Sequence, residues 1–210
     1  KILYHKINTM EKRIFNIETR IDSDDKGVDV IVGHASLYDS RSENLGGFFE
    51  YIERGAFTPD LIDKSDVRAL INHDQNLILA RTTSGTLKLE ADEMGLRYEF
   101  ENPQTSYAKD LAISMRRGDV TQSSFAFTVG EDEWSTDNDG NNIRTIKKIN
   151  RLYDVSPVTY PAYADTNDLT IAKRGLKEYE ESLVVKVDNI KKDITNKNES
   201  LVRGSLTSLK

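Results

Sequence analysis

Short runs of alternating apolar and polar residues cover most of the chain between residues 10 and 163, and this period of two limits the folds open to it. The runs occupy residues 10–21, 28–39, 67–72, 77–103, 118–130 and 131–163. Polar turn segments interrupt the pattern: "DSDDKG" at residues 22–27 separates the first two runs, and "DNDGN" at 137–141 divides the last run into the two arms of a hairpin. Because alternate side chains of a strand point to opposite faces of a sheet, the pattern predicts a protein made mainly of antiparallel strands.

Two segments have helical rather than strand spacing. The first, "TSYAKDLAISMRRGD" at residues 105–119, has an N-cap residue at Thr105 or Ser106 and a terminating glycine at Gly118. The second is a short helix with Thr58 as its N-cap and Pro59 as its first residue. The stretch before this short helix is predicted to be a loop around its glycines.

The character of the sequence changes at about residue 173, where it becomes highly charged with one aromatic residue. We therefore predict three parts: an N-terminal extension at residues 1–9, a domain at residues 10–172, and a charged C-terminal tail at residues 173–210 that is helical or disordered. The expected fold class is α+β, mainly β. Its core is a mostly antiparallel, barrel-like arrangement of strands with one or two helices packed around it.

Composition excludes several kinds of chemistry. The 210-residue chain has no cysteine and three histidines, so it can form neither a disulfide nor a thiolate zinc site, and it has no thiol nucleophile. Its net charge of −6 argues against a general nucleic-acid binder. No apolar run approaches the roughly 18 residues that span a bilayer. A hydrolase with this composition would use a Ser or Thr nucleophile, or a metal held by carboxylates.

The strand predicted at residues 118–130 has two adjacent serines. Ser123 shares a face with Phe125 and Phe127, which is typical of a core face, whereas Ser124 shares the other face with small residues. We therefore expect space for another molecule above Ser124. The strand is either an ordinary half-buried strand or one that presents a serine nucleophile.

Two further stretches contain groups that could activate a serine. In "LINHDQ", an apolar strand end leads into a loop at His73, a common position for catalytic side chains. In "RLYDVSPV", Asp154 and Ser156 share one face of a strand that is otherwise largely apolar. Asp154 either points to solvent or has a partner. A serine hydroxyl becomes a useful nucleophile when an imidazole accepts its proton and a third group orients that imidazole.

Taken in order, several motifs resemble the prohead (capsid-maturation) serine proteases of tailed phages, which share their fold with the herpesvirus capsid-assembly proteases. The motifs are "GHASLYD" (33–39), "GAF" (55–57), "LINHD" (70–74), "GL" (95–96), "RRGDVTQSSFAF" (116–127) and "YDVSPVTYPAY" (153–163). Together the likeness covers roughly residues 12–172. This sequence departs from the family pattern in having "SFAF" for "SFGF" and Asp154 where the family has Glu.

The resemblance implies a role for several side chains. It makes His73 the general base, Ser124 the nucleophile and Asp154 the third member of a triad. His34 is an alternative third member, because the herpesvirus branch uses a second histidine there. Arg116 or Arg117 could assist at the oxyanion site if the fold brings them near Ser124. No metal or other cofactor is expected.

The resemblance also implies a function. The chain would be a serine endopeptidase that cleaves a scaffold protein, or the scaffold-like part of the major capsid protein, and its own chain. It would act in the host cytoplasm inside the assembling procapsid, with self-association as a homodimer or larger assembly, and without binding nucleic acid directly or a membrane. Two alternatives remain open, a catalytically inactive scaffold or capsid-assembly protein of the same fold and a β-rich protein-binding module.

Overall fold

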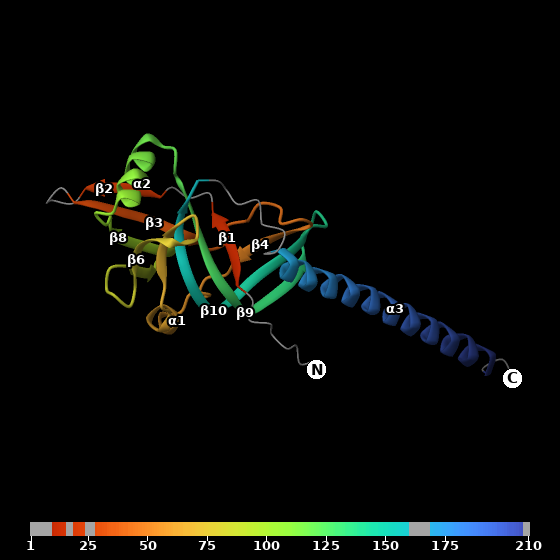
Figure 1. The fold of residues 1–210 in the computed structure, drawn as a ribbon. Helices are drawn as coiled ribbons and strands as arrows, with labels where there is room; N and C mark the ends of the chain where they lie inside the picture. The colour runs from red at the N-terminus through yellow and green to blue at the C-terminus, as the bar shows by residue number, and fades with distance from the viewer. Residues whose placement is uncertain (1–9, 16–18, 24–27, 160–168, 208–210) are drawn as a thin grey trace. The chain divides into compact units, whose positions relative to one another are not determined.

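The computed structural model describes residues 10–15, 19–23, 28–159 and 169–207 of the 210. The extension expected at residues 1–9 lies outside the described residues. Within the described ranges the chain forms ten strands and three helices (Figure 1). In chain order these are β1 (Glu11–Phe15), β2 (Arg20–Ser23), β3 (Asp29–Leu37), β4 (Phe48–Ile52), α1 (Pro59–Lys64), β5 (Arg68–Ile71), β6 (Asp74–Arg81), β7 (Lys88–Ala91), β8 (Gly95–Glu101), α2 (Ser106–Arg117), β9 (Gln122–Thr136), β10 (Asn142–Val158) and α3 (Leu169–Thr207).

The strands form two sheets. One has the order β1-β9-β10-β5-β6, with β4 also paired to β10, and the other has the order β2-β3-β8-β7. All strand pairs are antiparallel except two, β4 with β10 and β5 with β10, which are parallel. The fold is therefore α+β and mainly β, which confirms the predicted class. In Figure 1 the long strands β9 and β10 run side by side through the domain.

Local signals account for the boundaries of the two short helices. The Thr58 hydroxyl accepts a hydrogen bond from the Leu61 N–H, and Pro59 is the first residue of α1, as predicted. Helix α2 begins after Thr105 and ends at Gly118, whose φ of 81° is the left-handed conformation that glycine adopts at little cost. Its buried residues Ala108, Leu111, Ala112 and Met115 share one face.

The strand β4 is missing from the sequence prediction, which placed a loop there. Its residues alternate in burial, and it pairs in parallel with β10 from Phe48↔Asn142 to Ile52↔Ile146. A parallel partner so distant in the sequence provides no local turn signal, and Gly46 and Gly47 made the stretch look irregular. Strand β9 is also longer than expected and continues to Thr136.

Side chains from both sheets form one apolar core. Phe125 and Phe127 of β9 stack with ring centroids 4.4 Å apart, and both are fully buried. They pack in the same cluster as Ile31, Leu96 and Tyr98 of the other sheet. The core therefore covers one face of β9, as the phenylalanines indicated.

The opposite face of β9 differs from the prediction. Ser124 and Ala126 are 0% exposed and Thr128 is 1% exposed, so the expected open space above Ser124 is absent. The Ser124 side chain is instead in contact with the His73 ring and the Arg13 carbonyl, in keeping with the close packing of protein interiors.

A cluster of charged side chains, buried except for Asp132, ties β1 to other strands of its sheet. The Arg13 Nε donates to Glu50 of β4 at 2.7 Å, and Arg144 of β10 donates to Glu11 at 2.8 Å and to Asp132 at 2.7 Å. Burial alone would raise the pKa of Glu11, but the charges of Arg13 and Arg144 bring it below its ordinary value. Two guanidinium groups thus hold three carboxylates and anchor β1 beside β9.

The chain forms two compact units, residues 1–171 and 172–210. The C-terminal segment that we expected to be helical or disordered is helical through residue 207, as part of the 39-residue helix α3. Among the described residues, no helix has the length and apolar character needed to cross a membrane.

Candidate active site

His73 lies in a tight turn between β5 and β6 rather than in a longer loop. Asn72 and His73 both have positive φ, 52° and 59°, an uncommon conformation that asparagine tolerates better than most residues. The Asn72 side chain accepts hydrogen bonds from the Thr159 N–H at 2.9 Å and its hydroxyl at 3.2 Å, and its N–H donates to the Pro157 carbonyl at 3.1 Å. These bonds fasten the turn to the end of β10.

Ser124 lies beside the Nε2 atom of His73. The Ser124 Oγ lies 2.7 Å from His73 Nε2 and 2.9 Å from the backbone carbonyl of Arg13 in β1. The hydroxyl has one proton and two possible acceptors. When Nε2 carries no proton, it can accept the hydrogen bond from the Ser124 hydroxyl. When both ring nitrogens carry a proton, Nε2 donates to Oγ and the hydroxyl donates to the Arg13 carbonyl.

Asp154 completes a continuous chain of hydrogen bonds. Its Oδ1 lies 2.5 Å from His73 Nδ1, and the side chains of His73 and Asp154 are only 10% and 9% exposed. A carboxylate at Nδ1 keeps the proton on that nitrogen, so the lone pair of Nε2 faces the serine. The Ser156 hydroxyl donates to the same Asp154 oxygen at 2.8 Å and is fully buried.

An irregularity in β10 sets the side-chain directions at this site. The pairing changes from Leu152↔Phe127 to Asp154↔Ala126, so Tyr153 is an extra residue on β10. After this bulge Ser156 lies opposite Ser124. Because directly paired residues of antiparallel strands point to the same face, the bulge brings Asp154 and Ser156 to the face of Ser124.

A family model described as caudovirus prohead serine protease matches residues 15–182 of the chain, which includes all of these side chains. The chain belongs to this family. It is thus a serine protease of the prohead type. A search of the curated proteins found no match.

Among solved structures, this prohead-type protease is similar to the bacteriophage T4 capsid assembly protease, gp21, at 13% sequence identity and a TM-score of 0.43. The similarity covers 70% of this chain and 98% of the T4 chain.

The second candidate for the third triad position, His34, lies in the other sheet of the protease. Its Nε2 is 2.7 Å from Asp92 Oδ2. Burial would raise the pKa of Asp92, but hydrogen bonds from His34 and from the N–H groups of Gly95 and Met94 lower it. The structure brings Asp154 to the His73 ring and places His34 at the turn between β7 and β8.

The two arginines considered for the oxyanion site are also engaged elsewhere. Arg116 pairs with Asp29, and the Arg117 Nε lies 3.1 Å from Asp119. Both lie in the last turn of α2 with exposed side chains, and no described contact joins either one to Ser124.

Three contributors to the site went unrecognised in the sequence. Asn72 and the bulge at Tyr153 depend on contacts between distant segments. Ser156 was noted only as a neighbour of Asp154 on one strand face, and that shared face was the signal that could have identified it. No group of three or more His, Asp or Glu side chains in the described part of the protease is placed to hold a metal ion.

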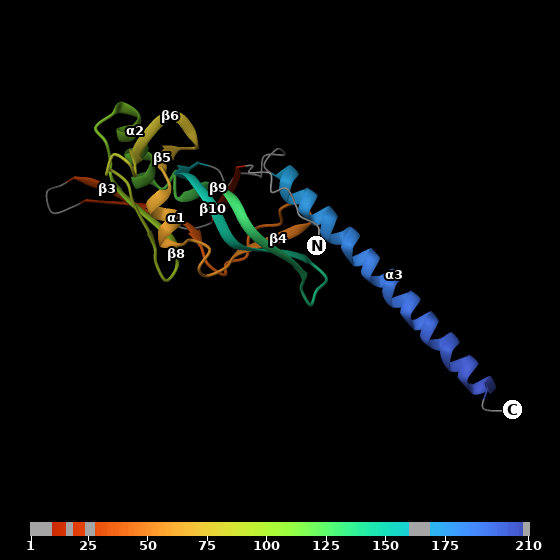
Figure 2. The ribbon, with the colours of Figure 1, turned by 90° about the horizontal axis from the view of Figure 1, so that it is seen from below.

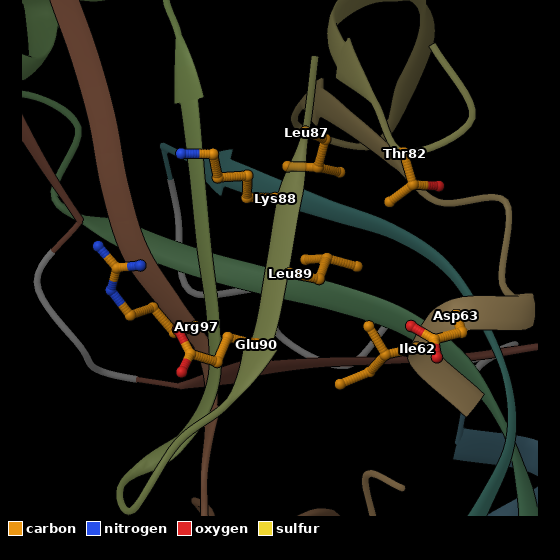
Figure 3. Close-up of a pocket in the computed structure, with 8 residues that line it drawn as sticks. All are labelled: Ile62, Asp63, Thr82, Leu87, Lys88, Leu89, Glu90 and Arg97. Atoms are coloured by element: carbon orange, nitrogen blue, oxygen red, sulfur yellow. The ribbon is translucent and has the colours of Figure 1, made fainter. Parts of the chain in front are cut away.

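The protease also has a surface depression of about 490 Å³ between α1 and the β7–β8 hairpin (Figure 3). Its walls include Ile62, Leu87, Leu89 and Arg97, and none of His73, Ser124 or Asp154 lines it. The depression is therefore separate from the hydrogen-bonded serine, histidine and aspartate.

Proposed function

We propose that the chain is a serine endopeptidase in which Ser124 is the nucleophile, His73 the general base and Asp154 the group that orients His73. The observation that carries this proposal is the relay of 2.7 Å from Ser124 Oγ to His73 Nε2 and 2.5 Å from His73 Nδ1 to Asp154. A general base must lie within hydrogen-bond reach of the proton that it removes, and this one does.

The reaction would follow the acyl-enzyme route. Ser124 Oγ attacks the carbonyl carbon of the scissile peptide bond while its proton passes to His73 Nε2. The imidazolium, stabilised by the Asp154 carboxylate, then donates that proton to the leaving amine as the C–N bond breaks. A water molecule, deprotonated at the same nitrogen, hydrolyses the acyl-serine, and Ser124 regains its proton from His73.

Burial of Ser124 adds a condition to this mechanism. The residue is 0% exposed, and its hydroxyl can also donate to the Arg13 carbonyl of β1. A substrate carbonyl reaches Oγ only after the groups that cover it have moved. In this arrangement the relay is formed while access to Ser124 Oγ is restricted.

Membership of the prohead serine protease family supports a proposal for the substrates. We propose that the enzyme acts inside the assembling procapsid in the host cytoplasm, where it cleaves the scaffold protein or the scaffold-like part of the major capsid protein, and its own chain. Chains confined to one shell are at high local concentration, which would favour cleavage by a protease whose active site opens only part of the time.

The test compares two neighbouring serines. Co-expression with the capsid and scaffold proteins of the same phage should yield processed fragments for the unmodified chain and for Ser123→Ala, and none for Ser124→Ala. Ser123 is a matched control because it is equally buried on the same strand but bonds to Tyr98. Circular dichroism would establish that both variants fold.

A serine-directed phosphonate gives a second readout. Mass spectrometry should find the adduct on Ser124 in the unmodified chain and on no residue of Ser124→Ala. Unchanged processing by Ser124→Ala would remove Ser124 as the nucleophile. Unprocessed capsid proteins with both the unmodified chain and Ser123→Ala would contradict the proposed substrates.

A further inference from the structure

The helix α3 has a row of apolar side chains, of which three are exposed and one, Leu183, is partly buried. Leu183, Val187, Ile190 and Ile194 follow one another at spacings of four, three and four residues, which places them on one face of a helix. Val187, Ile190 and Ile194 are 49%, 58% and 55% exposed. Figures 1 and 2 show α3 as one uninterrupted helix through this region. An exposed row of this kind indicates an interaction surface.

This spacing is that of a coiled coil. In heptad terms Val187 and Ile194 are at position a, and Leu183 and Ile190 are at position d. Charged residues occupy the next core positions on either side, Glu180 at a and Lys197 at d. The row therefore has four apolar positions with an acidic residue before it and a basic residue after it.

A parallel, in-register pair of such helices would bring like charges together. Each core residue would face its own copy, so Glu180 would face the partner's Glu180 and Lys197 the partner's Lys197. At the edges, Lys186 at position g would approach the partner's Lys191 at position e. Like charges at these positions select against a pairing mode.

An antiparallel pair brings opposite charges together instead. With the two-fold axis midway between residues 188 and 189, Leu183 packs against the partner's Ile194, and Val187 packs against the partner's Ile190. The same register places Glu180 opposite the partner's Lys197. At the edge, Lys186 lies beside the partner's Asp193. Symmetry repeats each of these contacts once.

We propose that α3 pairs with α3 of a second copy of this chain as an antiparallel coiled coil centred between residues 188 and 189. The interface is isologous, with four apolar layers closed at both ends by a glutamate–lysine layer. It goes beyond the proposed function, because the serine, histidine and aspartate all belong to the other compact unit. Four apolar layers form a short coiled coil, so we expect association that depends strongly on protein concentration.

The first test uses charge reversal. Sedimentation velocity of the full chain carrying Ser124→Ala, which prevents self-cleavage, measures the dimerisation constant over a concentration series. Lys186→Glu faces the partner's Asp193 in the antiparallel pair and should weaken dimerisation roughly three- to tenfold. In a parallel pair the same glutamate would face the partner's Lys191 and strengthen dimerisation.

The double variant Lys186→Glu with Asp193→Lys exchanges the two charges and should restore dimerisation. Ile190→Glu introduces charge into two apolar layers and should reduce dimerisation more than tenfold. A chain that is monomeric throughout the concentration series, a dimer that survives Ile190→Glu, or stronger association of Lys186→Glu would each overturn the proposal.

The second test takes advantage of the absence of cysteine. Mixed Leu183→Cys and Ile194→Cys chains should form a disulfide-linked heterodimer on mild oxidation, because these positions share a layer in the antiparallel pair. Leu183→Cys alone should remain unlinked, whereas a parallel pair would crosslink it to itself. Both tests measure mass, so their outcome is distinguishable from any failure of the proposed proteolysis.

Discussion

Within the described residues, two histidine–aspartate pairs have short contacts, and they differ in what else the two side chains touch. The His73–Asp154 contact measures 2.5 Å and the His34–Asp92 contact 2.7 Å. Asp92 also accepts hydrogen bonds from the N–H groups of Met94 and Gly95, so the His34–Asp92 pair stabilises a turn. Asp154 accepts a hydrogen bond from the Ser156 hydroxyl, and the second ring nitrogen of His73 lies within hydrogen-bond distance of Ser124 Oγ.

The comparison teaches that a histidine and a carboxylate in contact do not make a catalytic site by themselves. The distinguishing group is a hydroxyl at the other ring nitrogen. His73 has one, whereas no such hydroxyl contact to His34 is found within the described part of the chain. The surroundings differ in exposure too, since the His34 and Asp92 side chains are 16% and 26% exposed.

The largest expected difference between the two pairs comes from removing each imidazole. His73→Ala should lower kcat/KM at least about a thousandfold, because Ser124 then has no base. His34→Ala should leave kcat/KM within about threefold and lower Tm by about 4 °C, as expected for a structural hydrogen bond. Peptide-cleavage kinetics and thermal unfolding measure both; equal losses of activity would abolish the distinction.

A change at each carboxylate sharpens the comparison. Asp154→Asn cannot accept the Nδ1 proton in the same way, which favours the wrong tautomer of His73, and kcat should fall about a thousandfold or more. Asp92→Asn should leave kcat nearly unchanged. If Asp154→Asn retained most of its activity, Asp154 would lose its assigned role.

A smaller effect is expected at Ser156, whose hydroxyl donates to Asp154 and lies 3.4 Å from His73 Nδ1. Ser156→Ala removes a hydrogen bond to a buried carboxylate, so kcat should fall about tenfold with KM unchanged, because Asp154 still reaches His73 but is less firmly oriented. The variant Ser156→Cys has a weaker donor of similar size, so its kcat should lie between those of the unmodified chain and Ser156→Ala. A rise in KM with kcat intact would instead indicate a substrate-binding role.

The smallest expected effect is on the pH dependence of stability, through Asp92 in the turn between β7 and β8. Because the folded pKa of Asp92 is below its ordinary value, its hydrogen bonds stabilise the fold above that ordinary value and lose this contribution as pH falls through the folded pKa. Asp92→Asn should therefore lower the free energy of unfolding by about 1 kcal/mol at pH 7 and by less in acid. Urea unfolding at several pH values measures this; a difference that grows in acid would contradict it.

Much of the local structure could be predicted from the sequence. Thr58, Pro59 and Gly118 marked helix ends because capping depends on residues close together in the chain. The phenylalanines of β9 indicated its core face for a similarly local reason. Long-range features were not accessible in this way, since β4 pairs with residues about ninety positions later and the turn at Asn72 is held by the end of β10.

The site shows the same division. The sequence by itself limited the possible chemistry, because the absence of cysteine excluded a thiol nucleophile, and the motifs that resemble the family predicted His73, Ser124 and Asp154 as the reacting groups. Which histidine meets the serine was decided by tertiary structure. Parallel pairing of β5 with β10 and the bulge at Tyr153 bring the three groups together. Register between strands depends on packing over the whole sheet, and no single stretch of sequence encodes it.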